Sequence, residues 1–514
     1  MGEITIKMVI LDSYILKQTE IYISKGMNLQ NIIDEYLREL DLDAEFTENI
    51  KAAYYHLNGG PDLRDYQQNC LDHCLNYYKN LININYQLRW CCGLGKTKMA
   101  STIIKRSGYR SICIGLPSII LLEQFYQELK LFFPGNKICR VYSGKDSDEE
   151  GDIQAKTSDD LNSYLIGMDQ YKIVLVTYHS SKKVRDSGFK FDLLVSDEAH
   201  HLEGKTQRKF NNFLAISCDK RLFLTATPYI GLEDSKRLSF TDSAIFAGQN
   251  DSKSVKWSIE NQYITDYRIV ILNMREVDYR KLSRPYIPTD LTLAAYMAVR
   301  ALYQGISKKI LIYSNTVANA KMITDLIEDF LEECNAMETE INPMGKDLQI
   351  GNYELNGTHS HPVRKTCIED FKSVEYGIMS SVQLFGEGFD YPSLDTVIFA
   401  EKMSSDIRIV QSGLRPCRKD ITNPKKVAHI MIPIQDGDFS KVKQVICKMK
   451  EIDDIRGKIS VVGRNFTRSL CRNGMNTDDY LNKVLSRIRL DYLDETEKID
   501  LPDVKSSTIL ECKV

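Results

Sequence analysis

Short runs of apolar residues alternate along this chain with longer segments whose apolar residues recur at helical spacing. Such runs are typical of buried strands, and such segments are typical of amphipathic helices. Because each run is apolar at nearly every position, we expect the strands of a parallel sheet covered by helices on both faces. In the first half of the chain the predicted strands are Ile82–Trp90, Ser111–Gly115, Lys172–Val176, Phe191–Val195 and Arg221–Leu224.

The same alternation returns in the second half, after a polar stretch. It predicts a second α/β domain with strands of the same buried kind. A chain of 514 residues with 43% hydrophobic content is long enough for two or three cores, which agrees with two such domains. The predicted strands of this half are Lys309–Tyr313, Tyr376–Met379, Thr396–Phe399 and Val427–Ile432.

Three segments lie outside the two α/β patterns. At the N-terminus, alternation over Ile4–Ile10 and Thr19–Ile23 predicts two strands, and helical spacing over Leu29–Leu40 predicts a helix. We expect a small α+β segment there, a linker or insertion between the halves, and a mostly helical, charged C-terminal extension. The predicted boundaries are 1–58, 59–230, 231–261, 262–435 and 436–514.

The charge balance neither indicates nor excludes a nucleic-acid partner. The formal net charge is −3, so no overall basic field marks the chain, although local phosphate contacts need none. Thirteen cysteines occur without any Cys-x-x-Cys pair, which favours reduced thiols. Without an 18-residue apolar run or a signal-peptide pattern, we expect a soluble, intracellular chain without a membrane partner, cytoplasmic or nuclear.

A glycine-rich loop between a predicted strand and a predicted helix carries the clearest chemistry. Glycines allow successive backbone N–H groups to face one anion, the lysine adds positive charge for phosphates, and the threonine hydroxyl can bind Mg²⁺. The helix that follows presents its positive N-terminus to the same anion. The predicted phosphate-binding residues are Cys92, Gly93, Leu94, Gly95, Lys96 and Thr97.

An acidic pair follows the predicted strand Phe191–Val195, and two threonines follow the next strand. Asp197 can bind the metal ion, and Glu198 can orient and deprotonate a water molecule. Thr225 and Thr227 can relay hydrogen bonds from this edge of the sheet. Alone, such residues are more often a solvated strand end, but their place in a βα repeat after the phosphate loop favours a hydrolytic centre.

Further polar groups lie upstream and in the second half. Gln67, in the stretch Leu63–Gln67, offers the donor and acceptor that an adenine edge requires, and it is predicted to bind ATP together with Arg64. A motif in the second half begins at Gln411 and carries two guanidinium groups, those of Arg415 and Arg418. The two arginines are three positions apart, so they would share one face of a helix. Such arginines can stabilise charge on a transferring phosphoryl group.

In this order the motifs resemble superfamily 2 helicases, over roughly residues 60–435. The branch that looks closest contains restriction-enzyme motor subunits and helicases of large DNA viruses. The resemblance implies two RecA-like domains with ATP and Mg²⁺ between them. The chain carries the letters of a DEAH box at 197–200, but it lacks the second glycine that DEAH-box RNA helicases have in the Gln411–Arg418 motif.

The resemblance also implies a role for individual residues. Lys96 and Thr97 would bind phosphate and metal, Asp197 the metal and Glu198 the water. Arg415 and Arg418 would be arginine fingers, and Gln411 would sense the γ-phosphate. Asp390 would bind ATP and couple the two sites. Thr225 and Thr227 would link hydrolysis to strand movement, and His200 would join that relay. Contacts to a nucleic-acid strand would come from Pro117, Ser118, Thr177, Ser314 and Asn315.

Two residues depart from the family pattern, and three functions stay open. Trp90 stands where a small residue is usual, and Leu414 replaces a glycine before the first arginine finger. The leading hypothesis is an ATP-dependent helicase or translocase that acts on DNA or RNA. Transcription or replication proteins are its expected protein partners, and the virion is an expected location if the chain is viral. The alternatives are a translocase that remodels complexes without unwinding and a nucleic-acid-binding scaffold with a decayed ATPase.

Overall fold

The computed structural model divides the chain into two compact units, Met1–Lys253 and Ser254–Val514. Across the described residues, no helix combines the length and apolar character needed to cross a membrane. The residues described are 13–39, 44–143, 153–168, 170–202, 210–227, 246–274, 279–334, 339, 341–382, 391–403, 406–435, 440–455 and 458–462.

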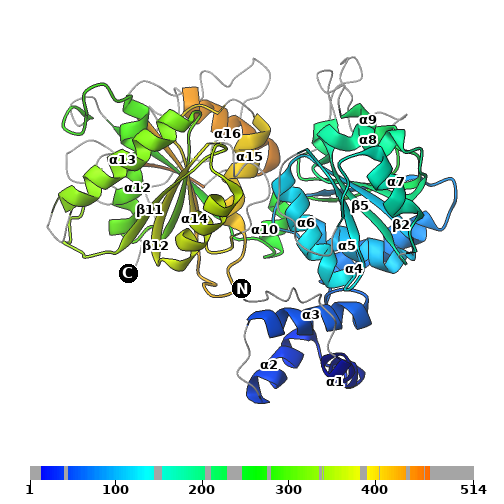
Figure 1. Cartoon of the computed structure of the whole chain (residues 1–514). Coiled ribbons are helices and arrows are strands. Elements are labelled where there is room, and N and C mark those ends of the chain that lie inside the picture. The colour runs from blue at the N-terminus through cyan, green and yellow to red at the C-terminus, as the bar shows by residue number, and fades with distance from the viewer. Residues whose placement is uncertain are drawn as a thin grey trace, which may run out of the picture. The chain divides into compact units, whose positions relative to one another are not determined.

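The first unit is built on an eight-stranded sheet in the order β4-β3-β5-β2-β6-β7-β1-β8, with parallel neighbours throughout. Helices pack on both of its faces (Figure 1). Its strands are β1 (Asn85–Trp90), β2 (Ser111–Leu116), β3 (Ile138–Val141), β4 (Ile153–Gln154), β5 (Lys172–Thr177), β6 (Phe191–Ser196), β7 (Cys218–Thr225) and β8 (Gln249–Lys253).

Helices alternate with these strands along the first unit. The central strands β2, β5 and β6 are buried along almost their whole length, as their apolar sequences predict. The helices are α1 (Ser13–Ser24), α2 (Leu29–Glu39), α3 (Ala44–Asn58), α4 (Asp65–Tyr78), α5 (Lys96–Ser107), α6 (Ile119–Phe132), α7 (Ser158–Ile166), α8 (Ser181–Asp186) and α9 (Asn211–Leu214), with single turns η1 (Tyr178–Ser180) and η2 (Ala199–Leu202).

The N-terminal segment is helical where a strand was expected. Residues 19–23 lie inside α1, and residues 4–10 lie outside the described part of the chain. Ile15 and Thr19 are both buried, so the inward positions are spaced four apart, which is helical spacing. This layer attaches to the sheet domain through the rings of Tyr55 and Phe132, whose centroids lie 5.1 Å apart.

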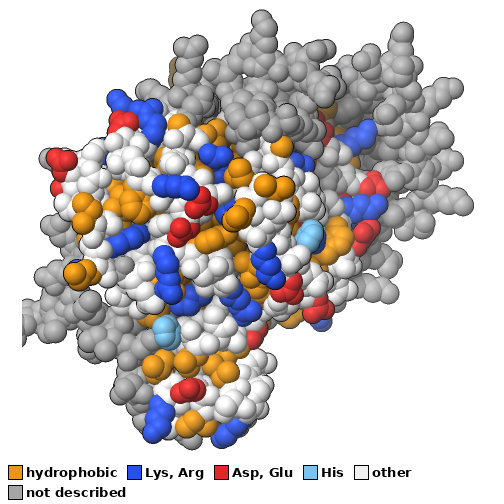
Figure 2. All heavy atoms as spheres, turned by 90° about the vertical axis from the view of Figure 1, so that its right-hand side faces the viewer, with side chains coloured by type: hydrophobic (Ala, Val, Ile, Leu, Met, Phe, Trp, Pro, Cys, Tyr) orange, Lys and Arg blue, Asp and Glu red, His pale blue; other side chains and the backbone are white. Residues whose placement is uncertain are grey.

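The predicted linker contains regular structure. Residues 249–253 form β8, which pairs in parallel with β1, and residues 255–260 form the first helix of the second unit. Parallel pairing with the strand before the phosphate loop holds the polar β8, although its residues show no apolar pattern. Figure 2 shows Lys and Arg side chains interspersed with Asp and Glu among the described residues of one face, as the small net charge predicts.

The second unit is built on a seven-stranded sheet in the order β11-β12-β10-β13-β14-β9-β15, again with parallel neighbours. The two parallel sheets confirm the predicted pair of RecA-like domains. The strands are β9 (Tyr267–Met274), β10 (Lys309–Tyr313), β11 (Ile350–Leu355), β12 (Tyr376–Ser381), β13 (Thr396–Phe399), β14 (Ala428–Gln435) and β15 (Ile459–Val462).

Its helices enclose a core that centres on α12, which is buried from Leu291 to Tyr303. Within the described part of the predicted C-terminal extension, α16 is followed by the edge strand β15. The helices are α10 (Val255–Glu260), α12 (Thr289–Tyr303), α13 (Val317–Cys334), α14 (His361–Ser373), α15 (Asp406–Gly413) and α16 (Ser440–Ile452), with the single turn η3 (Arg415–Cys417).

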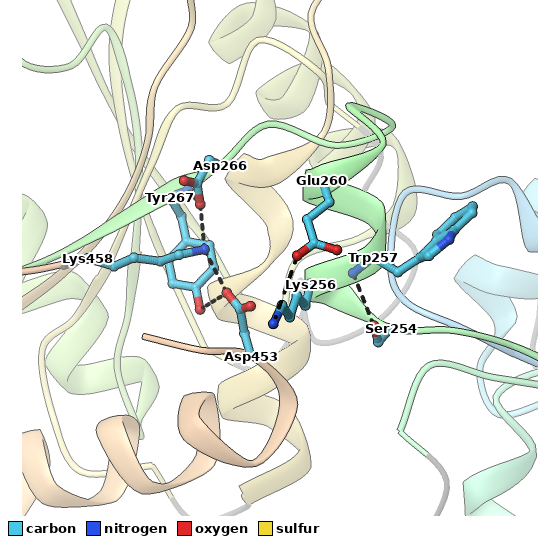
Figure 3. Close-up of polar contacts among 8 residues, drawn as sticks. All are labelled: Ser254, Lys256, Trp257, Glu260, Asp266, Tyr267, Asp453 and Lys458. Carbon is cyan, nitrogen blue, oxygen red and sulfur yellow. Dashed lines mark hydrogen bonds and ion pairs between the residues drawn. The ribbon is translucent and has the colours of Figure 1, made fainter. Parts of the chain in front are cut away.

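An ion cluster fastens β15 to the rest of its sheet (Figure 3). Lys458 donates to Asp266 over 2.7 Å and to Asp453 over 2.8 Å, and the Asp453 side chain is only 2% exposed. The hydroxyl of Tyr267 donates to the same Asp453 carboxylate over 2.8 Å. Desolvation alone would lower the pKa of Lys458, but the carboxylates of Asp266 and Asp453 outweigh it and raise that pKa. The cluster therefore holds the ends of β9, α16 and β15 together.

Candidate functional site

The glycine-rich loop lies at the carboxyl edge of the first sheet, between β1 and α5. Gly93 and Gly95 adopt φ values of 86° and 82°, a left-handed conformation that glycine reaches without strain. The helix α5 begins directly at Lys96, so its first backbone N–H groups face the loop. The local geometry is that of a phosphate cradle at a helix N-terminus, as the sequence predicts.

Trp90, the residue that departs from the family pattern, is the centre of contacts beneath this loop. Its backbone carbonyl accepts a hydrogen bond from Lys96 Nζ over 3.2 Å. Its fully buried indole donates from Nε1 to Asp251 Oδ1 over 2.6 Å, and its ring meets that of Tyr66 edge-on at 5.2 Å. The tryptophan thus replaces a small residue by filling the space between β1, α4 and β8.

Gln67 lies against the phosphate loop. Its Nε2 donates to the carbonyl of Leu94 over 3.1 Å, and its Oε1 accepts from the backbone N–H of Arg64 over 3.0 Å. The hydroxyl of Tyr66 donates to the same Leu94 carbonyl over 2.8 Å. Both ends of the Gln67 amide are therefore bonded to backbone, and because an amide has a second N–H and a second oxygen lone pair, these bonds are compatible with contact to an adenine edge.

The acidic pair follows β6 at the same edge of the sheet. Asp197 is 4% exposed, and one of its carboxylate oxygens accepts from the backbone N–H of Glu198 over 3.0 Å. Glu198 itself has a φ of 46°, which is a left-handed conformation that is uncommon for a residue with a side chain. In the sheet, β7 separates β6 from β1, so one strand lies between the acidic pair and the strand that leads to the phosphate loop.

His200 connects the acidic pair to β7. Its Nδ1 lies 3.4 Å from Glu198 Oε2 and 3.3 Å from Thr225 Oγ1. The hydroxyl of Thr225 also accepts from the backbone N–H of Thr227 over 3.2 Å. Burial, followed by His201 and Lys96, holds the pKa of His200 well below its usual value, so the imidazole is neutral. Of the four residues with predicted coupling roles, His200, Thr225 and Thr227 are thus joined through the Thr225 hydroxyl.

The side chains present fit a phosphate-bound divalent cation. Hydroxyl and carboxylate oxygens are the ligands that Mg²⁺ prefers, and Thr97 and Asp197 supply one of each. Burial alone would lower the pKa of Lys96, but the neighbouring Cys92, Glu198 and Asp197 outweigh it and raise that pKa. Lys96 therefore remains charged beside the carboxylates, in an environment suited to an anionic ligand and its cation.

The second unit brings the predicted arginine motif together at the end of α15. Gln411 and Arg415 are buried, with 4% and 6% exposure. The helix ends at Gly413, and Arg415 opens the single turn η3, whereas Arg418 has extended backbone with φ −63° and ψ 137°. The two arginines therefore do not share one helix face. Lys426 donates to the carbonyl of Arg418 and so fixes the end of the motif.

The predicted strand contacts of the first unit follow two neighbouring strands. Leu116, the last residue of β2, pairs with Thr177, the last residue of β5. Pro117 and Ser118 are half-buried, and the Ser118 hydroxyl caps α6 by accepting from the backbone N–H of Leu121 over 3.3 Å. Thr177 is 5% exposed. These positions form one edge, but a helix cap already uses one hydroxyl.

The corresponding residues of the second unit lie after β10. Ser314 is buried, and its backbone N–H donates to the carbonyl of Ser381 over 3.1 Å. Asn315 is exposed, and its side chain donates to the carbonyl of Lys402 over 3.0 Å. Asp390 lies outside the described residues.

Sequence reasoning missed several residues that position this site. Asp251 and the β8 carbonyl of Lys253, which accepts from the N–H of Cys91 over 3.1 Å, lie in a polar stretch that resembles a linker. Tyr178, which donates to the carbonyl of Asp197 over 2.5 Å, follows β5 without a motif of its own. Only Trp90 carried a signal, because it breaks the family pattern.

Comparisons with known proteins agree with this arrangement. The family model "Type III restriction enzyme, res subunit" matches residues 60–230, and "Helicase conserved C-terminal domain" matches residues 295–420. A protein of African swine fever virus (isolate Tick/Malawi/Lil 20-1/1983) that is named "Probable helicase" is 26% identical over 383 residues. That match covers 70% of this chain and 41% of the viral protein, so the chain spans about two fifths of this relative's length.

Two solved structures share the fold. A DNA-bound structure of the ATP-dependent Type ISP restriction-modification enzyme LlaBIII has a TM-score of 0.67 at 19% identity, and covers 84% of this chain and 33% of that one. S. cerevisiae Dbp5 bound to RNA and ADP BeF3 has a TM-score of 0.52 at 13% identity, with 88% and 98% covered. At such identities the likeness concerns the fold.

Proposed function

The chain belongs to the superfamily 2 helicases, and on that premise we propose that it couples ATP hydrolysis to movement along, or unwinding of, a nucleic acid. One observation carries the proposal. The phosphate loop and the acidic pair Asp197–Glu198 occupy the same edge of one parallel sheet, and the charged Lys96 is influenced by both carboxylates. This edge is where α/β sheets bind ligands.

The residues of the first unit divide the work of hydrolysis. The backbone of the phosphate loop and the N-terminus of α5 hold the phosphates, and Lys96 leaves the carbonyl of Trp90 to join them. Thr97 and Asp197 would hold Mg²⁺, which supplies charge neutralisation on the phosphate oxygens when bound. Glu198 orients a water molecule and accepts its proton.

The relay beside Glu198 connects this chemistry to the neighbouring strand. With its proton on Nδ1, neutral His200 can donate either to Glu198 Oε2 or to Thr225 Oγ1, so an exchange between the two oxygens connects Glu198 to Thr225 without adding charge. Thr225 and Thr227 then carry the state of Glu198 along the end of β7. This contact gives hydrolysis a mechanical outlet in the first unit.

The second unit would supply the arginines that act on the nucleotide. Arg415 and Arg418 would stabilise charge on the transferring γ-phosphoryl group, and Gln411 would sense that group. Arg415 is 6% exposed and opens the turn η3, so burial limits the conformations that its side chain can adopt. Asp390, next to this motif in the family pattern, would couple the two sites.

The track is a DNA or RNA strand held through its phosphates. Thr177 with Pro117 and Ser118 in the first unit, and Ser314 with Asn315 in the second, offer hydroxyl, amide and backbone donors that hold phosphate without reading bases. The relatives support either polymer, because one structure of this fold contains DNA and another contains RNA. Transcription or replication proteins would be its partners if the chain has a viral source.

The test measures ATP hydrolysis by the wild-type chain without polymer and with single-stranded DNA, duplex DNA, single-stranded RNA or duplex RNA. Stimulation by one polymer, lost in Glu198→Gln while ATP still binds, supports the motor. We expect this substitution to reduce kcat by about 100-fold or more, because the general base is removed. The matched control is Asp72→Asn, which neutralises an exposed carboxylate on α4 and should leave the rate unchanged.

The same preparation distinguishes the alternatives. Release of a labelled strand from a duplex marks a helicase, whereas displacement of bound streptavidin from an intact duplex marks a translocase that does not unwind. Hydrolysis that ignores every polymer contradicts the motor. ATP binding without hydrolysis in the wild-type chain indicates a scaffold.

A further inference from the structure

The peptide between Asp197 and Glu198 is fixed at every polar atom around it. The backbone N–H of Asp197 donates to the carbonyl of Gly115 over 2.9 Å. The carbonyl of Asp197 accepts from the hydroxyl of Tyr178 over 2.5 Å. The next N–H, that of Glu198, donates to the Asp197 carboxylate over 3.0 Å, and the carbonyl of Glu198 accepts from the N–H of His201 over 3.0 Å.

These bonds hold Glu198 in a backbone conformation that its side chain disfavours. Its φ of 46° is left-handed, and a residue with a Cβ atom reaches that region only when its surroundings determine it. Rotation of the 197–198 peptide toward a relaxed conformation would turn the Asp197 carbonyl away from Tyr178. The hydroxyl of Tyr178 therefore opposes this rotation. The left-handed backbone in turn determines the direction in which the Glu198 side chain leaves the chain.

Tyr178 itself is rigidly placed. It is fully buried, and its ring packs edge-on against Phe213 at 5.2 Å and in a tilted arrangement against Phe210 at 5.5 Å. Gly115 leaves the space that the ring needs, because a Cβ atom there would lie 2.6 Å from the Tyr178 ring. The hydroxyl is thus aimed at Asp197 by a packed aromatic cluster, and few other positions are open to it.

The backbone of Tyr178 continues directly from the edge where a strand would bind. Thr177 ends β5 and pairs with Leu116, and Pro117 and Ser118 follow Leu116. Tyr178 is the residue directly after Thr177, so a bound phosphate that shifts this edge would also shift the Tyr178 backbone. Because the ring is packed, the shift passes to the hydroxyl and so to the Asp197–Glu198 peptide.

We propose that Tyr178 is a positioning residue that aligns Glu198 for hydrolysis and transmits occupancy of the Thr177 edge to it. The transmission half of this inference rests on the proposed nucleic-acid-dependent ATPase, whereas the alignment half requires only that the chain hydrolyses ATP. Tyr178 touches neither water nor nucleotide in this role. It acts through the backbone of the acidic pair.

The experiment compares the wild-type chain with Tyr178→Phe, which keeps the ring and removes the hydroxyl. We measure kcat and KM for ATP with and without the stimulating polymer, and the affinity for that polymer. The expected result is a loss of about tenfold in the stimulated kcat, with the KM for ATP and the polymer affinity within about twofold of wild type. Removal of a positioning contact changes the rate without changing binding.

Tyr164→Phe is the matched control, because it isolates the loss of a buried hydroxyl. The Tyr164 hydroxyl is also bonded to backbone: it lies 2.9 Å from the carbonyl of Lys137 and 3.1 Å from that of Ile173, and it accepts from the N–H of Ile173 over 2.9 Å. These contacts lie at the other end of β5 from Thr177, so this variant should lose at least as much stability as Tyr178→Phe. A similar stability loss in both variants, with a lowered kcat in Tyr178→Phe alone, supports the proposal. Wild-type stimulation in Tyr178→Phe overturns it.

A wild-type chain that no polymer stimulates refutes the proposed function and, with it, the transmission half. The alignment half is then decided by the unstimulated kcat of Tyr178→Phe. A reduced value with unchanged KM supports it, and an unchanged value overturns it.

Discussion

The indole Nε1 of Trp90 donates a hydrogen bond to Asp251 Oδ1 over 2.6 Å, which joins the strand before the phosphate loop to the last strand of the first unit. Lys253 completes the contact by donating to the same oxygen over 2.7 Å. Since the backbone N–H of Cys91 also bonds to the Lys253 carbonyl, β8 supports the loop from both side chain and backbone.

Two substitutions at Trp90 should separate the hydrogen bond from the packing. Trp90→Phe removes the N–H and keeps a ring, so we expect a loss of about 1–2 kcal/mol in the free energy of unfolding. Trp90→Ala empties a fully buried site and should cost about 3–5 kcal/mol. The chain has two tryptophans, and in these variants only Trp257 of the second unit remains, so tryptophan fluorescence would not report the first unit. Urea unfolding followed by circular dichroism is therefore the appropriate measurement. Equal losses in the two variants would show that the hydrogen bond outweighs the packing.

Lys458 should contribute strongly to the stability of the second unit. Its replacement in Lys458→Met leaves the buried Asp453 carboxylate without its cation, and we expect a loss of about 3 kcal/mol in the free energy of unfolding. Asp266 is 47% exposed, so the control Asp266→Asn should cost less than about 1 kcal/mol. Trp257 fluorescence in a Trp90→Phe background reports this unit alone. A small loss in Lys458→Met would mean that the cluster has no net stabilising effect.

His200 should make the folded chain sensitive to acid. Burial holds its folded-state pKa well below the ordinary value of 6.5. At mildly acidic pH the imidazole of His200 is therefore neutral in the folded chain and protonated in the unfolded chain. Stability from this group is therefore full above that ordinary value and is lost as the pH falls below it. Between about pH 7.5 and about pH 5.5, wild type should lose about 1 kcal/mol more unfolding free energy than His200→Asn. Parallel pH dependences in urea titrations would contradict the assignment.

Arg415 should be irreplaceable by lysine if it acts as an arginine finger. A lysine keeps the charge but loses the planar fork that contacts several phosphoryl oxygens, so Arg415→Lys should reduce kcat by about 1000-fold. ATP affinity should change little, because the contact develops in the transition state. The control is Arg268→Lys, a half-buried arginine of β9, and the measurement is steady-state hydrolysis with stimulating polymer. A lysine variant with near wild-type kcat would exclude the role.

The sequence predicted the parts of this protein that depend on local pattern. The strand, glycine loop and helix around Lys96 form one continuous segment, so apolar runs and glycines were enough to place them. Asp251 and Tyr178 could not be found in this way, because their partners come from other strands and depend on register. The strand expected at Thr19–Ile23 failed for a related reason: short alternation is compatible with a helix whose buried positions are spaced four apart.

The left-handed backbone at position 198 implies that folding and chemistry favour different residues there. Glycine would adopt a φ of 46° without the steric cost of about 1–2 kcal/mol that a side chain incurs. A laboratory selection for thermal stability alone would thus favour replacing the acidic side chain, and on the proposed mechanism each such gain in stability would abolish ATP hydrolysis. On the proposed mechanism, the left-handed backbone at Glu198 is a cost in stability that is retained because catalysis needs a carboxylate there.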